Sequence, residues 1–434
     1  MLFKSTRTNG SPVSFREAIL HCLPGDGGLY VPATVADLRQ FILYMDDDTS
    51  YPELVSTIAP ALMEGELNPG SAARVAESAF DFEPQLRTLD KHLSVLELHN
   101  GPTGVFKDFG IAFLAAMMEE LLRGGGRAMT LTATTGDTGS SVARAFAGRA
   151  GITAVILYPR GEARGLDPST FISSGGNILP IRIDGSFDDC QRLIREAFED
   201  RAFAARYGLT SANTINVGRL LPQVFYFLYA FVKLKRDLTG DFYFSIPSGN
   251  FGNLTAALYA WKFGMPVNGF IAAMNSNDSF GDFLRGKSFS PRPSVATVSN
   301  SMDVGNPSNF ERLASFYAES PAVMRNMVYP ESVDDGETLA AMERAWKKHG
   351  LLLDPHGAVG FAAAERMLKG DLEDGHVVVV STGHPAKKAE LVGKAIGRAV
   401  DVPPSLEGLR KVVEPVATIA PRLDALEAAI AGSF

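Results

Sequence analysis

Short apolar runs alternate with helical patterns along most of the chain after residue 93, and this alternation restricts the fold more than any other feature. The expected strands cover residues 94–98, 128–133, 153–158, 177–183, 241–247, 269–274 and 376–380. Helical patterns separate them, for example over residues 140–150. A strand, a helix and a second strand in this order form a parallel βαβ unit. The sequence therefore predicts an α/β fold with a parallel sheet.

The two ends of the chain show different patterns. Residues 1–93 predict a mostly helical N-terminal unit, whose first helix is capped by Ser14. The residues after Pro403 predict a peripheral helical tail. We therefore expect the N-terminal unit over 1–93, a smaller α/β lobe over 94–210, and a larger α/β lobe with the tail over 211–434.

Composition and charge exclude several classes of protein. With 434 residues, 46% of them hydrophobic, the chain can bury a sizeable core. The formal net charge of -8 gives no reason to expect nucleic acid as a partner. Cys22 and Cys190 supply neither a disulfide framework nor a metal site, and no apolar run is long enough to span a membrane. We expect a cytoplasmic protein with no metal and no membrane partner.

Lys107 follows a turn at Gly101–Gly104 and lies in the first turn of a helical pattern that begins at about Phe106. Apolar residues recur on its side of that helix at Ile111, Leu114 and Met118. The helix dipole and this apolar face both disfavour a cation, so we expect a lowered pKa and a neutral amine. A neutral amine is what a lysine needs to form a Schiff base. The alternative is a lysine whose ammonium extends from a core helix to solvent.

A loop at residues 248–253 joins a strand to a helix, and its composition suits an anion. Gly249 and Gly252 allow the backbone to approach phosphate oxygens. Ser248 and Asn253 can add donors. The first N–H groups of the helix have no intrahelical acceptor and attract anions. The loop therefore predicts a phosphate site, with a plain turn that uses glycine for positive φ as the alternative.

A second loop, at residues 134–140, is also rich in groups that can bind an anion. Its glycines and hydroxyl residues are Thr134, Thr135, Gly136, Thr138, Gly139 and Ser140. Neither loop is a Walker loop or a Gly-x-Gly-x-x-Gly fingerprint, so a kinase or an NAD enzyme is disfavoured. The alternative for this loop is a threonine-rich turn that caps its own helix. Two anion sites and one desolvated lysine suggest a phosphorylated cofactor and an anionic substrate.

Two further groups of polar residues are candidates for the site. Asn213 and Arg219 belong to a polar cluster before an apolar helix over 220–235, and an arginine suits bidentate recognition of phosphate or carboxylate. A surface arginine near a helix end is the alternative. His356 and His384 fall in loops, and we expect a structural role for both.

The chain resembles the threonine synthase family, in its longer bacterial and fungal type, over nearly its whole length. The motifs that carry the resemblance are 5–7, 26–32, 101–103, 106–108, 132–139, 216–223, 247–253, 302–309, 353–356 and 384–387. The resemblance implies pyridoxal 5'-phosphate (PLP) as the cofactor. It also implies the tryptophan-synthase-β-like fold (fold type II), with two open parallel-sheet lobes and a mostly helical N-terminal unit.

The resemblance also implies a role for each candidate residue. Lys107 would form the Schiff base with PLP and act as the catalytic base. The residues expected to bind the cofactor are Lys107, Asp137, Gly249, Asn250, Phe251, Gly252, Asn253 and Thr382. Among them, Asp137 stands where related enzymes carry an asparagine near the phenolic oxygen, and Thr382 would meet the pyridine nitrogen. The residues expected to bind the substrate phosphate are Thr135, Thr138, Asn213 and Arg219.

The implied reaction is a carbon–oxygen lyase reaction on a phosphate ester. O-phospho-L-homoserine and water would give L-threonine and phosphate, in the last step of threonine biosynthesis. The alternative is a threonine-synthase-like phospho-lyase that releases phosphate and a 2-oxo acid. The motifs do not separate the two, because they differ only in whether water reaches Cβ before the intermediate escapes.

Overall fold

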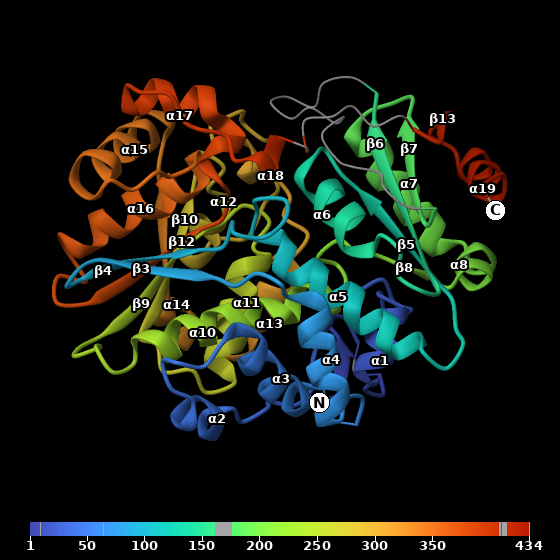
Figure 1. The fold of residues 1–434 in the computed structure, drawn as a ribbon, viewed down its shortest axis with the longest axis horizontal. Helices are drawn as coiled ribbons and strands as arrows, with labels where there is room; N and C mark the ends of the chain where they lie inside the picture. Colours follow the sequence, from blue (N-terminus) through green and yellow to red (C-terminus); the bar gives the residue numbers. More distant parts are fainter. Residues whose placement is uncertain (9, 64, 161–175, 408, 410–414, 434) are drawn as a thin grey trace.

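The structure is a computed structural model that describes residues 1–8, 10–63, 65–160, 176–407, 409 and 415–433. The strands within these ranges form a six-stranded, a five-stranded and a two-stranded sheet. In Figure 1 the six-stranded sheet lies on the left and the five-stranded sheet on the right, with helix α5 (Lys107–Leu122) near the middle. The chain therefore folds as two α/β lobes, as expected.

The six-stranded sheet has the strand order β11-β10-β9-β12-β4-β3. Its strands are β3 (Gln85–Asp90), β4 (Leu93–Glu97), β9 (Phe242–Pro247), β10 (Gly269–Met274), β11 (Val328–Ser332) and β12 (His376–Ser381). Neighbouring strands are parallel, except that β3 pairs antiparallel with β4. The carboxyl ends of β4, β9 and β12 therefore meet at one edge of the sheet.

Helices cover both faces of this sheet. Phe242 and Phe244 of β9 pack on one face, in the core that includes α10 (Val224–Leu234) and α11 (Gly252–Lys262). Tyr243 points to the other face, in the core of α15 (Asp335–His349) and α16 (Pro355–Leu368). Because successive residues of a strand alternate between faces, a strand buried on both sides is apolar throughout. This explains why these strands are continuous apolar runs in the sequence.

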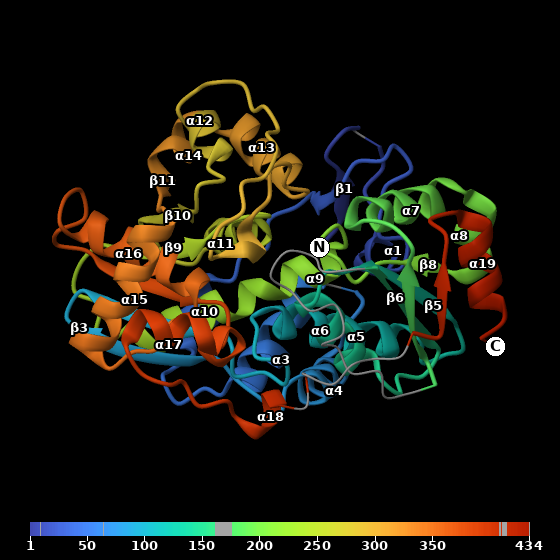
Figure 2. The ribbon, with the colours of Figure 1, turned by 90° about the horizontal axis from the view of Figure 1, so that it is seen from above.

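The five-stranded sheet has the order β13-β7-β6-β5-β8 and is parallel throughout. Its strands are β5 (Ala128–Ala133), β6 (Ile152–Pro159), β7 (Ile178–Ile183), β8 (Leu209–Thr210) and β13 (Ala417–Ile419). Its helices are α6 (Asp137–Phe146), α7 (Phe187–Glu199), α8 (Arg201–Tyr207) and α19 (Leu423–Ala431). Figure 2, seen from above, places α7, α8 and α19 together at the outer side of this lobe.

The N-terminal unit packs onto the two lobes and shares their core. It contains β1 (Phe3–Ser5), β2 (Tyr30–Pro32), α1 (Phe15–Leu20), α2 (Arg39–Tyr44), α3 (Tyr51–Leu62) and α4 (Pro69–Ala79). The predicted cap of α1 is present, since Ser14 accepts a hydrogen bond from the Glu17 N–H. Tyr51 meets Phe109 of α5 edge-to-face, with ring centroids 5.4 Å apart. The unit is therefore continuous with the hydrophobic core that contains α5.

Shorter helices connect these parts. They are α9 (Val217–Leu220), η1 (Leu221–Gln223), α12 (Ser279–Leu284), η2 (Asn300–Met302), α13 (Phe310–Glu319), α14 (Pro321–Met327), η3 (Pro385–Lys388), α17 (Ala389–Ile396) and α18 (Pro404–Glu407). The single helix predicted over 220–235 is divided into α9, η1 and α10, because Pro222 lacks the N–H that a continuous helix needs. Throughout the described ranges, each helix is too short or too polar to cross a bilayer.

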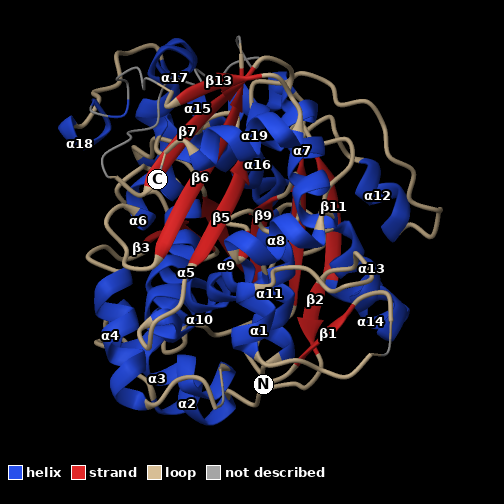
Figure 3. Cartoon of the chain, turned by 90° about the vertical axis from the view of Figure 1, so that its right-hand side faces the viewer, coloured by secondary structure: helices blue, strands red, loops and turns tan. Residues whose placement is uncertain are grey.

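Several strands differ from the sequence-based expectation. The short strands β1, β3, β8, β11 and β13 were not predicted. β4 pairs with β12 of the six-stranded sheet, although the predicted division puts residues 94–97 in the smaller lobe. β13 pairs with β7 of the five-stranded sheet, although that division puts the tail in the larger lobe (Figure 3). The boundaries stay a prediction, but these two pairings cross them.

Candidate active site

Lys107 is the first residue of α5 and is held by the turn before it. Asp108 accepts hydrogen bonds from both the backbone N–H and the hydroxyl of Thr103. Gly104 has a φ of +69° in this turn, and a Cβ there would come within 2.9 Å of Leu406. The Phe106 N–H donates to the carbonyl of Thr382, at the end of β12, over 2.9 Å. The turn therefore fixes the start of α5 against the edge of the six-stranded sheet.

The Lys107 ammonium lies in a mostly buried, charged environment. Its side chain is 19% exposed, and Nζ lies 3.3 Å from Oδ2 of Asp137. Burial is the largest cause that lowers the pKa of Lys107; Asp137 opposes it, whereas Arg219 and Lys387 lower the pKa further. The direction agrees with the prediction from sequence. The neighbouring cations Arg219 and Lys387 were not part of that argument.

Asp137, the first residue of α6, holds two lysines. Its Oδ1 lies 3.0 Å from Nζ of Lys387, and its Oδ2 faces Lys107. Burial alone would raise the pKa of this carboxyl, but Lys387 and Lys107 bring it well below its ordinary value. The carboxylate is therefore ionised at neutral pH. Lys387 was quoted in the family motif, but it was not among the expected site residues.

The loop at 248–253 has the features of a phosphate cradle. Phe251 adopts a left-handed φ of +57°, which is rare for a residue with a side chain. A Cβ on Gly249 would lie 2.6 Å from the Cα of Met302, so only glycine fits this close approach. The first N–H groups of α11 start here and have no intrahelical acceptor. The Nδ2 group of Asn253 is buried and has no partner among the described residues.

These observations test whether the loop fits the phosphate of PLP. A buried amide without a partner, at the N-terminus of a helix, leaves a donor that a phosphate oxygen would satisfy. Ser248 differs from the expectation, since its hydroxyl donates to the Ile246 carbonyl over 2.8 Å. The side chain of Asn250 is also engaged, by Ser308 and Thr214. The loop therefore fits the group through its backbone and Asn253.

A second layer of polar residues supports this loop and was missed at the level of sequence. Asn309 donates to the Asn250 carbonyl over 3.1 Å and to the Thr214 hydroxyl over 2.9 Å. Arg312 is fully buried and donates to Asn309 and to the carbonyls of Tyr30, Thr214 and Ile215. Asn309 belongs to the motif 302–309 that carries the family resemblance, but neither Asn309 nor Arg312 was among the expected site residues.

The loop at 134–140 divides its hydroxyls between two tasks. Thr134 accepts hydrogen bonds from the N–H groups of Gly136 and Gly139, at 3.0 and 2.9 Å, so it caps its own turn. The hydroxyls of Thr135 and Thr138 form no hydrogen bond within the part of the chain that the structure describes, and both residues are half-buried. The loop therefore combines a structural threonine with two that remain available to a ligand.

Arg219, which the resemblance assigns to the same substrate phosphate as Thr135 and Thr138, is a buried cation. The residue is 5% exposed, and its Nη1 donates to the Ala212 carbonyl over 2.7 Å. Burial lowers its pKa to about 10. Among the described residues it pairs with no carboxylate, so the buried charge lacks a counter-ion that a bound anion would supply. Asn213 lies beside it, with Nδ2 donating to the Ala133 carbonyl over 3.3 Å.

α9 packs directly against α5, and this contact brings Arg219 to Lys107. A Cβ on Gly110 would lie 2.4 Å from the Arg219 carbonyl and 3.4 Å from its Cγ. Gly110 is one turn after Lys107 on α5. A small residue here thus lets two helices approach closely. The structure brings together Lys107, Asp137 and Arg219, from three segments far apart in the sequence.

The two candidate histidines have structural contacts. His356 Nδ1 contacts Oδ2 of Asp354, and its Nε2 accepts a hydrogen bond from the Ser301 N–H over 3.1 Å. His384 Nδ1 accepts from the Ala386 N–H and caps η3. Both sets of contacts agree with the structural role expected from sequence, but His356 lies in the first turn of α16 and not in a loop, because Asp354 caps that helix.

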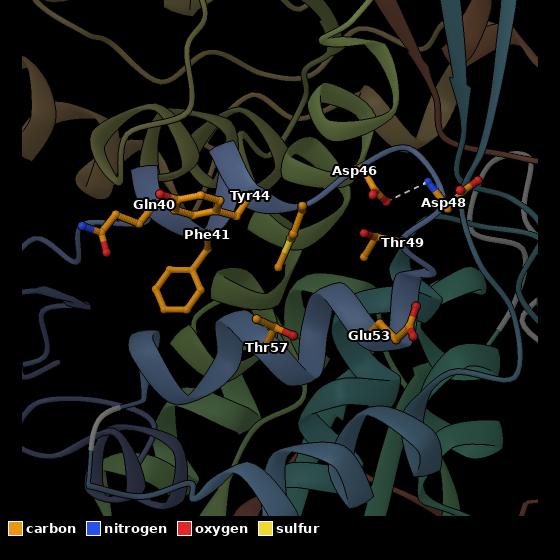
Figure 4. A pocket seen from close by; sticks show the side chains of 9 residues that line it. Gln40, Phe41, Tyr44, Asp46, Asp48, Thr49, Glu53 and Thr57 are labelled. Atoms are coloured by element: carbon orange, nitrogen blue, oxygen red, sulfur yellow. Dashed lines mark hydrogen bonds between the residues drawn. The ribbon is translucent and has the colours of Figure 1, made fainter.

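A pocket in the N-terminal unit lies apart from these residues. It has a volume of about 660 Å³ and lies between α2 and α3, where Figure 4 shows Phe41, Tyr44 and Glu53 at its wall. None of its lining residues is a candidate site residue. It lacks a buried lysine or arginine, so it does not resemble an anion site.

Comparisons with known proteins agree with this site. A family model described as "Pyridoxal-phosphate dependent enzyme" matches residues 85–383. The models "Threonine synthase N terminus" and "Threonine synthase, C-terminal" match residues 2–80 and 357–430. The threonine synthase of Escherichia coli is 37% identical over 411 residues, which cover 94% of each chain. That of Haemophilus influenzae is 36% identical and covers 91% of each.

Solved structures extend the similarity to the whole fold. The crystal structure of threonine synthase from Escherichia coli matches with a TM-score of 0.88 at 33% identity, and covers 100% of both chains. The PLP-bound threonine synthase from Brucella melitensis matches with a TM-score of 0.89 at 30% identity, covering 100% of this chain and 99% of that one. The predicted fold type and the predicted cofactor are thereby confirmed. The chain belongs to the threonine synthase family of pyridoxal-phosphate-dependent enzymes.

Proposed function

We propose that this protein converts O-phospho-L-homoserine and water to L-threonine and phosphate. Family membership supports the reaction type. The observation that carries the assignment is the buried guanidinium of Arg219 near Lys107, which pairs with no carboxylate of the described residues. The hydroxyls of Thr135 and Thr138, which have no partner within the same residues, are further donors. A phosphate group on the substrate would supply the missing counter-ion.

The cofactor would be held at three points. Lys107 would bond to its carbonyl carbon, because burial favours the neutral amine. The 248–253 loop would hold its phosphate through backbone N–H groups and Asn253. Thr382, at the end of β12 beside the residue before Lys107, would meet the pyridine nitrogen. When bound, PLP withdraws electrons from the substrate carbon that loses its proton.

The protein's own groups would then carry the proton and phosphate steps. Lys107 would take the Cα proton as a neutral base. Arg219, Asn213, Thr135 and Thr138 would hold the phosphate and stabilise the charge that develops as it leaves Cγ. Over the whole reaction the C–O bond at Cγ breaks and Cγ gains a proton, while Cβ loses a proton and gains the hydroxyl of water.

We also propose that the enzyme works in the cytoplasm on this small molecule alone. The formal net charge of -8 supports a partner other than nucleic acid. Cys22 and Cys190 are both free and buried, which fits a reducing compartment. A helix long enough for a membrane span is absent from the described ranges.

Product identification tests the proposal. Incubation of the PLP-loaded protein with O-phospho-L-homoserine is expected to yield equal amounts of L-threonine and phosphate, measured by chromatography and a phosphate assay. Phosphate release with a 2-oxo acid in place of threonine would instead identify a phospho-lyase. The absence of any phosphate release would reject both.

A further inference from the structure

Two lysine side chains share the carboxylate of Asp137. Lys107 Nζ lies 3.3 Å from Oδ2, and Lys387 Nζ lies 3.0 Å from Oδ1. The side chains of Lys107, Asp137 and Lys387 are 19%, 14% and 23% exposed. At this burial, charges interact more strongly than in water. Each lysine therefore competes for the carboxylate and repels the other.

Lys387 is held in place by contacts other than Asp137. Its Nζ also donates to the carbonyl of Thr103, in the turn before Lys107, over 3.1 Å. The short helix η3 that carries it is tied to the same turn, since the His384 N–H donates to the Gly104 carbonyl over 2.8 Å. Residues 105 and 383 form an isolated antiparallel bridge. The position of Lys387 is thus fixed relative to Lys107.

We propose that Lys387 is a positioning residue that keeps the nitrogen of Lys107 unprotonated, because it occupies one oxygen of Asp137 and repels a second ammonium. The inference rests on the proposed function only in requiring Lys107 to react as a neutral amine. In that reaction the amine bonds to the aldehyde carbon of PLP. A C=N bond forms, and the aldehyde oxygen leaves as water with two protons of the amine.

Other charged groups also act on Lys107 and Asp137. Arg219 from α9 acts on Lys107, and His356 from α16 acts on Asp137. Lys388, next to Lys387, is itself influenced by Asp137. Of the two paired lysines, Lys387 has the larger effect on the carboxyl of Asp137. Removing Lys387 would therefore leave Asp137 to Lys107 and favour the protonated form of Lys107.

The test measures how fast the cofactor-free protein bonds to PLP, followed by visible absorbance, as a function of pH. Lys387→Gln removes the charge and keeps a donor for the Thr103 carbonyl. We expect the midpoint of its rate–pH profile to move to higher pH by about one unit. The rate of bonding to PLP would then be about tenfold lower at pH values below the midpoint and unchanged well above it. Lys387→Arg should retain the wild-type midpoint. Lys394→Gln, in an exposed pair with Glu390, is the control.

An unchanged profile in Lys387→Gln, or a rate lowered equally at all pH values, would overturn the inference. Asp137→Asn provides a second test, independent of the folding of the first variant. It removes the attraction for the Lys107 ammonium, so its midpoint should move to lower pH, and no movement would also reject the inference. Failure of the wild-type protein to bond to PLP at any pH would reject the proposed function instead.

Discussion

The two anion loops each follow a strand, one in each of the two large sheets, and they offer different groups to a ligand. The 248–253 loop presents backbone N–H groups and the amide of Asn253, all neutral. Gly249 of this loop lies close to Met302, and hydrogen bonds of Asn250 and Asn309 fix the loop to neighbouring residues. In the 134–140 loop the hydroxyls of Thr135 and Thr138 have no hydrogen-bond partner among the described residues, and the resemblance assigns the buried Arg219 to the same substrate phosphate.

This difference matches the ligands that we assign to the two loops. A cofactor that stays bound is served by a rigid, neutral cradle, because fixed donors need no rearrangement. A substrate phosphate must enter, gain negative charge as its bond to carbon breaks, and leave. It is better served by the full positive charge of an arginine and by hydroxyl groups that can rotate. Glycine-rich loops that follow parallel strands are therefore not equivalent. We expect the residues that surround each loop to decide which anion it holds.

The largest loss of activity is expected for a substitution of Lys107, on which the functions proposed for both loops depend. Lys107→Ala should lower activity by at least about a thousandfold, because both the bond to the cofactor and the base are lost. PLP would still bind through its phosphate, but without a bond that borohydride can reduce. Mass spectrometry after reduction checks this, with Lys394→Ala as the control. A reducible adduct in Lys107→Ala would contradict the assignment.

Arg219→Met removes the charge of the substrate side, which also lowers the pKa of Lys107. We expect kcat/KM for O-phospho-L-homoserine to fall by about 10²–10³-fold, because the leaving phosphate loses its main cation. The Kd of PLP should change by less than about threefold. Arg219→Lys keeps the charge without the planar guanidinium, so its kcat/KM should lie between those of the wild type and Arg219→Met. Equal losses in PLP affinity and kcat/KM would remove the distinction between the two loops.

Gly249→Ala tests the rigid cofactor side. The new Cβ would meet the Cα of Met302 at 2.6 Å, so the loop must shift. We expect the Kd of PLP to rise about tenfold, while KM for the substrate at saturating PLP stays nearly constant. Gly370→Ala is the matched control, because the nearest atom to its Cβ is 3.9 Å away. A rise in KM with unchanged PLP affinity would reverse the assignment of the loops.

The smallest effect is expected at Thr134, which caps the 134–140 loop. Thr134→Val leaves the N–H groups of Gly136 and Gly139 without their acceptor, and should cost about 1–2 kcal/mol of unfolding free energy. Thr132→Val is the control, because the hydroxyl of Thr132 is buried without a partner in the described structure and its loss should not destabilise. Urea denaturation measures both. Equal destabilisation in the two variants would show that Thr134 is not a cap.

Much of the fold and the candidate site could be predicted from local patterns. The expected strands at 128–133 and 269–274 match β5 and β10 residue for residue. Lys107 lies in the first turn of its helix as predicted, and burial lowers its pKa as predicted. These features depend on residues close in sequence, where periodicity, turns and helix ends leave few alternatives.

Other features depended on contacts between distant segments. Pairing of β4 with β12, and of β13 with β7, joins strands that are hundreds of residues apart, and short strands carry little pattern of their own. Arg312 gave no signal as a support of the cofactor loop, because its four acceptors are oxygens of Tyr30, Thr214, Ile215 and Asn309. Three of these acceptors are backbone carbonyls, which every residue has, so the sequence does not show which of them Arg312 binds.

The sequence by itself determined the alternating α/β architecture, the two glycine-rich loops and a lysine at the start of a helix, because each follows from the local chemistry of adjacent residues. The family motifs added the cofactor and the expected site residues. Only the tertiary structure decided which charges surround Lys107. Asp137, Arg219 and Lys387 reach it from three distant segments, and a pKa depends on distance in space, not on separation along the chain.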